Sequence, residues 1–218
     1  MVAKLLSMEI QGRRERKKLQ TRQLISDVAT GLFMEHGFDH VTVAEVAKAA
    51  DVAVQTVFNH FPTKEDLLFD QDDWWLGPAG VIEHAATGAQ VIEVLEEYYL
   101  SQIFLRLRSE HLATWKAFAR TIEESPALLA RRRKNAEEME LRIVQALQQR
   151  DPKVSPLRAQ LIATQYQAAQ KVLEAELARV LPEHPDAAQI TAVEATMRKA
   201  IRMVFGTLKD GLKHSLEG

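Results

Sequence analysis

Apolar residues recur three and four residues apart along most of the chain, which is the spacing that places side chains on one face of an α-helix. A first helix ends before Gly37, a residue that commonly terminates helices. In the C-terminal part, the same spacing predicts helices over 89–109, 110–124, 127–150, 157–181 and 186–216. The pattern therefore predicts an all-α fold, with its clearest break at Gly77, Pro78 and Gly80.

Residues 42–61 predict two short helices joined by a tight turn. Thr42 and Glu45 have the spacing of a capping box, in which each side chain bonds a free backbone N–H at the helix start. Asp51 tolerates the left-handed backbone of a turn. Val57, Phe58 and Phe61 mark the buried side of the second helix, and Gln55, Thr56, Asn59 and His60 remain on its other faces. This is the helix-turn-helix arrangement that reads DNA in the major groove.

Composition and charge fit such a protein. The net charge is −2, but Arg13, Arg14, Arg16, Lys17, Lys18 and Arg22 oppose only Glu15 just before the first apolar stripe. Alone, this run is a solvated helix start; beside a helix-turn-helix, it indicates phosphate neutralisation. The sequence has no cysteine, no apolar run of membrane-spanning length and no signal-peptide pattern, so a cytoplasmic protein without membrane partners is expected.

From about residue 13 to residue 68, the chain resembles the N-terminal domain of the TetR family of bacterial transcriptional regulators. The matching segments are GLFMEHGF at 31–38, TVAEVA at 42–47, DVAVQTVFNHF at 51–61 and KEDLL at 64–68. The family usually has Gly at the position of Asp51, Ser or Thr at that of Ala53, and Tyr at that of Phe58. The rest of the chain resembles the family only as a set of long helices.

The resemblance implies a flexible arm over 1–12, a helix-turn-helix domain over 13–62, and a helical effector-binding and dimerisation domain over 63–218. It also implies a dimer that binds a palindromic DNA operator and usually represses transcription. A small-molecule effector would release this dimer from the operator. We expect Gln55 and Asn59 to read adenine edges, and Val54 and Thr56 to contact thymine methyl groups. Contacts to the DNA backbone are expected from Arg13, Arg14, Thr42, Thr56, Phe58, His60 and Lys64.

An effector cavity lined by aromatic side chains and a few polar groups is expected among the C-terminal helices. Aromatic residues at helical spacing are also ordinary core, so each of these residues has that alternative. The candidates are Trp74, Trp75, Tyr98, Tyr99, Phe104, His111, Trp115, Phe118, Tyr166 and Gln170.

The last two helices carry apolar seams that can pack against the chain's own core or, as the resemblance implies, form a four-helix bundle with a second copy. The predicted interface residues are Leu161, Leu173, Leu177, Ile190, Met197, Ile201, Val204, Phe205 and Leu208.

Motifs of enzymes are missing from the sequence. The seven histidines are scattered, with neither metal-ligand spacing nor cysteine partners, and no glycine-rich phosphate loop or nucleophile elbow occurs. We therefore predict no catalytic residues, no metal and no cofactor. Two alternatives stay open: a helical binding or dimerisation module with vestigial DNA binding, and an enzyme whose site is assembled from distant C-terminal helices.

Overall fold

The computed structural model describes residues 2–69, 73–85, 90–109 and 112–214, and in these ranges it contains helices and no strand. The fold is all-α, as the apolar spacing predicts. Contacts within the chain define two compact units. The first comprises residues 1–71 and 117–131, and the second comprises 72–116 and 132–218.

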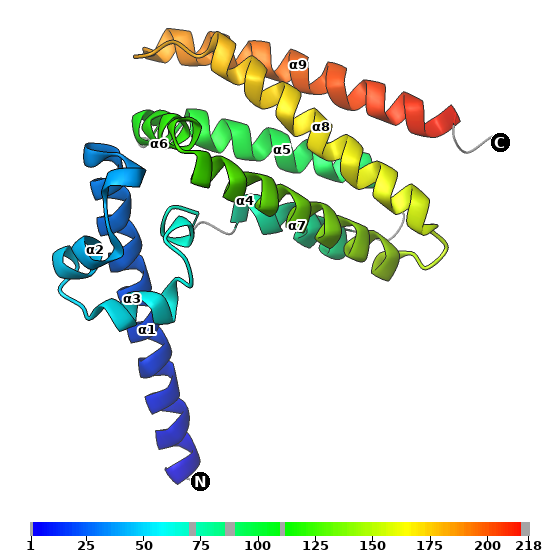
Figure 1. Cartoon of the computed structure of the whole chain (residues 1–218). Helices are drawn as coiled ribbons and strands as arrows, with labels where there is room; N and C mark the ends of the chain where they lie inside the picture. The colour runs from blue at the N-terminus through cyan, green and yellow to red at the C-terminus, as the bar shows by residue number, and fades with distance from the viewer. Residues whose placement is uncertain (1, 70–72, 86–89, 110–111, 215–218) are drawn as a thin grey trace. The chain divides into compact units, whose positions relative to one another are not determined.

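The first unit contains α1 (Val2–His36), α2 (Val43–Ala49) and α3 (Val54–His60), with short 3-10 turns at Phe38–His40 and Glu65–Leu67. Figure 1 shows α2 and α3 beside the C-terminal half of α1. Ile25, Phe33, Val46, Val57 and Phe61 are at most 1% exposed and form the core that holds the three helices together. Because α1 begins at Val2, the stretch expected to be a flexible arm is helical here.

Gly37 ends α1 as predicted, with a φ of 83° that a side chain would strain. After α3, Glu65–Leu67 form a single 3-10 turn. At its start, Thr63 N donates to Asp66 Oδ2 at 3.0 Å and Asp66 N donates to Thr63 Oγ1 at 3.3 Å.

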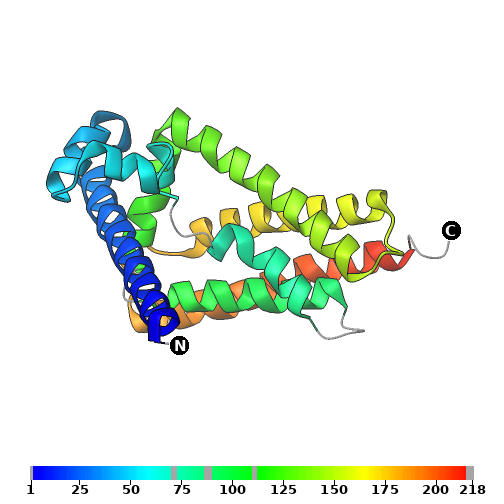
Figure 2. The ribbon, with the colours of Figure 1, turned by 90° about the horizontal axis from the view of Figure 1, so that it is seen from below.

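The second unit contains α4 (Asp73–His84), α5 (Val91–Leu107), α8 (Pro156–Val180) and α9 (Ala187–His214). α6 (Leu112–Glu124) and α7 (Pro126–Arg150) contribute to both units. In the second unit, α9 lies alongside α5 and α8 (Figure 1 and Figure 2). The predicted C-terminal helices agree with these bounds to within two residues at every end.

The predicted break at Gly77, Pro78 and Gly80 is wrong, because α4 runs through all three residues. Gly77 is required there for a packing reason. A Cβ atom at this position would lie 1.9 Å from the hydroxyl oxygen of Tyr98, so only glycine lets α5 approach α4 this closely. The glycine that the sequence suggests as a helix breaker is therefore a helix-packing residue.

Ion pairs hold α5 and α9 in an antiparallel register. Arg108 binds Glu194 through two hydrogen bonds of 2.6 and 2.9 Å, and the Lys209 ammonium lies 2.7 Å from Glu96 Oε2. Between these ends, Met197, Ile201 and Phe205 of α9 are fully buried in the core of the unit.

Candidate nucleic-acid interface

The start of α2 is closed by the predicted capping box. The Glu45 backbone N–H donates to Thr42 Oγ1 at 3.2 Å, and the Thr42 N–H donates to Glu45 Oε2 at 2.7 Å. These bonds favour the charged carboxylate and lower the pKa of Glu45. The capping box is confirmed, and it fixes where α2 begins relative to the turn that follows it.

Asp51 forms the predicted turn between α2 and α3, with a left-handed φ of 53°. Val52 N donates to the Ala47 carbonyl at 3.0 Å and closes the turn. Ala53 then occupies the N-cap position of α3, and without a hydroxyl it makes no side-chain cap. The N-terminus of α2 is therefore capped by a side chain, whereas the N-terminus of α3 is not.

The outer face of α3 carries Gln55 and Asn59, both exposed. Their side chains are one helical turn apart, and Gln55 Nε2 donates to Asn59 Oδ1 at 3.1 Å. Val57 is 1% exposed and faces the core. The placement of Phe58 on the buried side is wrong, since its side chain is 43% exposed. Val57 and Phe61 already fill the space beneath this seven-residue helix, so the Phe58 ring is turned to solvent.

Two basic side chains, Arg22 of the basic run and Lys64, a predicted contact to the DNA backbone, bind groups inside the domain. The Arg22 guanidinium donates to the His60 carbonyl at 2.5 Å and lies 4.3 Å from the centre of the Phe61 ring. The Lys64 ammonium donates to the Phe38 carbonyl at 2.5 Å and lies 4.2 Å from the Phe38 ring centre. Burial lowers the pKa of Lys64. Lys64 thus ties the turn after α3 to the end of α1, a structural role that its motif does not reveal.

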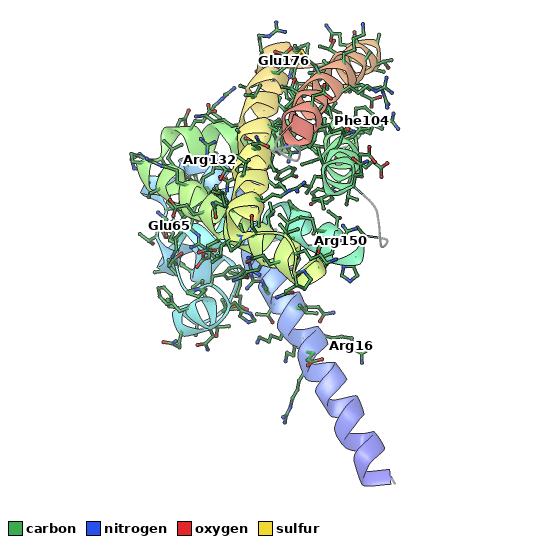
Figure 3. All side chains as sticks on the ribbon, turned by 90° about the vertical axis from the view of Figure 1, so that its right-hand side faces the viewer. Arg16, Glu65, Phe104, Arg132, Arg150 and Glu176 are labelled. Carbon is green, nitrogen blue, oxygen red and sulfur yellow. The ribbon has the colours of Figure 1, made fainter. Side chains whose placement is uncertain are left out.

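A basic face extends along α1. Arg14, Arg16, Lys17 and Lys18 are exposed, whereas the side chain of Arg13 lies outside the described residues. Figure 3 shows Arg16 projecting from this helix. A groove of about 310 Å³ separates this part of α1 from the end of α3; its lining includes Lys18, Arg22, Asn59 and His60. Basic side chains therefore continue from α1 to the edge of α3.

The candidate effector residues converge only in part. Tyr99 and Tyr166 are fully buried in the second unit, each with its ring centre 6.2 Å from that of Phe205. Gln170 is 6% exposed, and its amide nitrogen lies 3.4 Å from the Tyr166 hydroxyl. Burial raises the pKa of both tyrosines, so both phenols are neutral donors at ordinary pH.

Charged residues that the sequence analysis missed lie next to this group. Burial raises the pKa of Glu174, while the positive charges of Arg106 and Arg132 oppose that shift. Arg132, on α7, lies beside α8 in Figure 3. The sequence contained a signal for this site: Tyr166, Gln170 and Glu174 are spaced four residues apart and share one face of α8.

The other described effector candidates make separate ring contacts, although the Tyr98 phenol acts on the pKa of Tyr166. The Arg106 guanidinium stacks 4.5 Å from the centre of the Trp115 ring, and that of Arg198 lies 4.4 Å from Phe104. Phe118 packs on Phe69 in the first unit, with ring centres 6.2 Å apart, so it does not line a site within the second unit. Tyr98 packs on Gly77, as described above. The side chains of Trp74, Trp75 and His111 lie outside the described residues.

Most of the predicted dimer residues belong to the core of the second unit. Leu173, Leu177, Met197, Ile201 and Phe205 are fully buried within the chain itself, and Ile190, Val204 and Leu208 pack against them. Leu161 differs from these residues, since its side chain is 42% exposed. The apolar residues of α8 and α9 were predicted to be buried, and most of them are. Their helical spacing does not determine which helix they pack against.

Two further properties bear on function. No described helix is both long and apolar enough to cross a membrane. Among the described residues, no group of three acidic or histidine side chains is arranged to hold a metal ion.

Comparisons with known proteins agree with this architecture. Residues 25–70 match the family model described as "Bacterial regulatory proteins, tetR family". The chain is 30% identical over 152 residues to the HTH-type transcriptional regulator TcmR of Streptomyces glaucescens, an alignment that covers 64% of each protein. The chain thus spans less than two thirds of the length of this curated relative.

Solved structures share the fold. NalD of Pseudomonas aeruginosa, described as the secondary repressor of the MexAB-OprM multidrug efflux pump, aligns with a TM-score of 0.55 at 17% identity, over 84% of this chain and 97% of that one. A complex of SmeT with triclosan aligns with a TM-score of 0.56 at 16% identity, over 86% and 91% of the two chains. The names of these proteins describe TcmR as a transcriptional regulator and NalD as a repressor. The helix-turn-helix segment of the chain therefore matches the TetR family of bacterial regulatory proteins, and the chain shares the helical fold of NalD and SmeT.

Proposed function

We propose that this protein is a cytoplasmic, DNA-binding transcriptional regulator, a repressor that binds a palindromic operator as a dimer. The observation that carries the proposal is the outer face of α3, where Gln55 and Asn59 are exposed and joined by a hydrogen bond on a helix fixed by a capped turn. Amide side chains match the donor and acceptor edge of adenine. The basic face of α1 supplies the charge that phosphate contacts need.

Selection of bound duplexes from random-sequence DNA tests this function without knowledge of the operator. We expect enrichment of a palindrome whose half-sites are about 34–36 Å apart, one turn of DNA. Gln55→Ala and Asn59→Ala should each weaken binding to the selected duplex. Gln145→Ala, which removes an exposed amide from α7, is the matched control and should leave binding unchanged. Failure to enrich any sequence would favour a helical module with vestigial DNA binding.

The dimer is proposed to form through the exposed stripe of α8. Leu157, Leu161 and Val172 are 81%, 42% and 57% exposed, and their spacings of 4 and 11 residues are close to one and three helical turns. Met203 of α9 adds a further apolar side chain, 67% exposed. Sedimentation of Leu161→Lys and Val172→Lys should show monomers. Leu141→Lys, on the exposed face of α7, should remain dimeric.

A small-molecule effector is proposed to bind at the polar face of α8 formed by Tyr166, Gln170 and Glu174. Support comes from a buried polar group: Gln170 is 6% exposed beside the fully buried Tyr166, and burial raises the pKa of Glu174 one helical turn further along α8. The triclosan complex of SmeT belongs to a protein of the same fold. A compound that releases the selected duplex from the wild type, but not from Gln170→Leu, would identify the ligand and its site.

A further inference from the structure

The exposed face of α3 combines two kinds of surface. Val54 and Phe58 are 41% and 43% exposed, and they lie four residues apart, so their side chains form one apolar ridge along the helix. Gln55 and Asn59 have the same spacing and form an amide ridge directly beside it. Together these four residues make a surface in which an apolar ridge and an amide ridge run in parallel.

The amide ridge offers both a donor and an acceptor. With one N–H of Gln55 donated to Asn59 at 3.1 Å, the Gln55 carbonyl oxygen and the Asn59 amino group can bind an outside partner. One is an acceptor and the other a donor. Adenine offers the matching pair in the major groove, an N6 donor and an N7 acceptor.

The apolar ridge needs a partner without hydrogen-bonding groups. In the major groove, the thymine 5-methyl group is the apolar feature that distinguishes base pairs, and it belongs to the same A·T pair as the adenine edge. The Phe58 ring ends without a hydroxyl, so it has no group to donate to a phosphate oxygen. An exposed Phe on a recognition helix therefore fits a methyl group better than it fits the DNA backbone.

We propose that Phe58, together with Val54, reads thymine 5-methyl groups in the operator half-site. The inference rests on the proposed function and goes beyond it, because it turns a position expected to contact the backbone into one that determines sequence. Side chains four residues apart lie about 6 Å from each other, close to two base steps of about 3.4 Å. The methyl groups read by the two side chains are therefore on thymines separated by one or two steps.

Deoxyuridine tests the proposal because it removes the thymine methyl group and leaves every hydrogen bond of the base pair intact. Each thymine of the selected duplex is replaced in turn, and the dissociation constant is measured for the wild type and for Phe58→Ala. We expect one or two replacements per half-site to weaken wild-type binding by about fourfold, the worth of one buried methyl-sized group. In Phe58→Ala, replacement at the position that Phe58 reads should have no further effect.

Leu105→Ala is the matched control, since it removes an apolar side chain that is 70% exposed on α5 and should keep full sensitivity to deoxyuridine. If Phe58→Ala unfolds, Phe58→Leu provides a smaller apolar surface, and the wild-type series alone still decides whether methyl groups matter. The proposal is overturned if no replacement weakens wild-type binding, or if the wild type and Phe58→Ala respond equally. Tight binding to the selected duplex in that case leaves the proposed function standing, whereas failure to select any duplex refutes both.

Discussion

Ala53 offers a direct test of how the sequence controls the stability of the recognition helix. It stands at the N-cap of α3 with φ −70° and ψ 146°, the extended backbone from which a Ser or Thr hydroxyl reaches a free N–H of the first turn. Thr42 makes that bond at the start of α2, whereas Ala53 makes none. Ala53→Thr should therefore add the missing cap.

A side-chain N-cap contributes about 0.5–2 kcal/mol, typically about 1 kcal/mol, to the free energy of unfolding. For a chain of 218 residues, each kcal/mol raises Tm by about 2–4 °C. Calorimetry of Ala53→Thr beside Ala53→Val measures the hydroxyl alone, because Thr and Val have nearly the same shape. A Tm for the Thr variant no higher than that of the Val variant would refute the capping argument. Thr42→Ala should produce the reverse change, a loss of about 1 kcal/mol.

Three further predictions concern packing and charge. Gly77→Ala should cost about 1–3 kcal/mol of folding free energy through the collision with Tyr98, and Tyr98→Ala should relieve it; a Gly77→Ala protein with unchanged Tm would contradict the packing. Asp66→Asn should lower Tm, because it removes a partly buried ion pair of 2.9 Å with Arg131 that is worth about 1 kcal/mol or less. A double-mutant cycle that shows no coupling between Asp66 and Arg131 would contradict this contribution. Glu174→Gln should raise Tm at pH 7. The pKa of Glu174 is higher in the folded protein than in the unfolded chain, so ionisation of this group lowers stability as the pH rises through these two pKa values, and Gln cannot ionise. The gain should shrink toward pH 4, and a lower Tm at pH 7 would mean that the carboxylate is favourably paired.

Much of the helix-turn-helix could be predicted because its signals are local. The capping box at Thr42 and the left-handed turn at Asp51 depend on residues within a few positions of each other. Phe58 was misplaced for a non-local reason. Helical spacing alone is compatible with Phe58 on either the buried or the exposed face of α3. Its exposure is determined by the packing of Val57 and Phe61 in the core of the domain.

In the C-terminal region, the sequence predicts helices but not their partners. The apolar seam of α9 looks the same whether it meets α5 and α8 of the same chain or a second copy, and most of it proved to be internal. Glu174 and Arg106 escaped notice because charged residues on amphipathic helices are usually solvated. Their burial depends on α5 and α8 meeting 68 positions apart in sequence.

The central claim, sequence-specific DNA binding through α3, is tested most directly by titrating the protein with its selected duplex and with a shuffled duplex of the same composition across a salt series. We predict that the selected duplex binds at least about 10³-fold more tightly, that both affinities fall steeply with salt, and that Gln55→Ala reduces the ratio between them. Equal affinity for the two duplexes at every salt concentration would contradict the account.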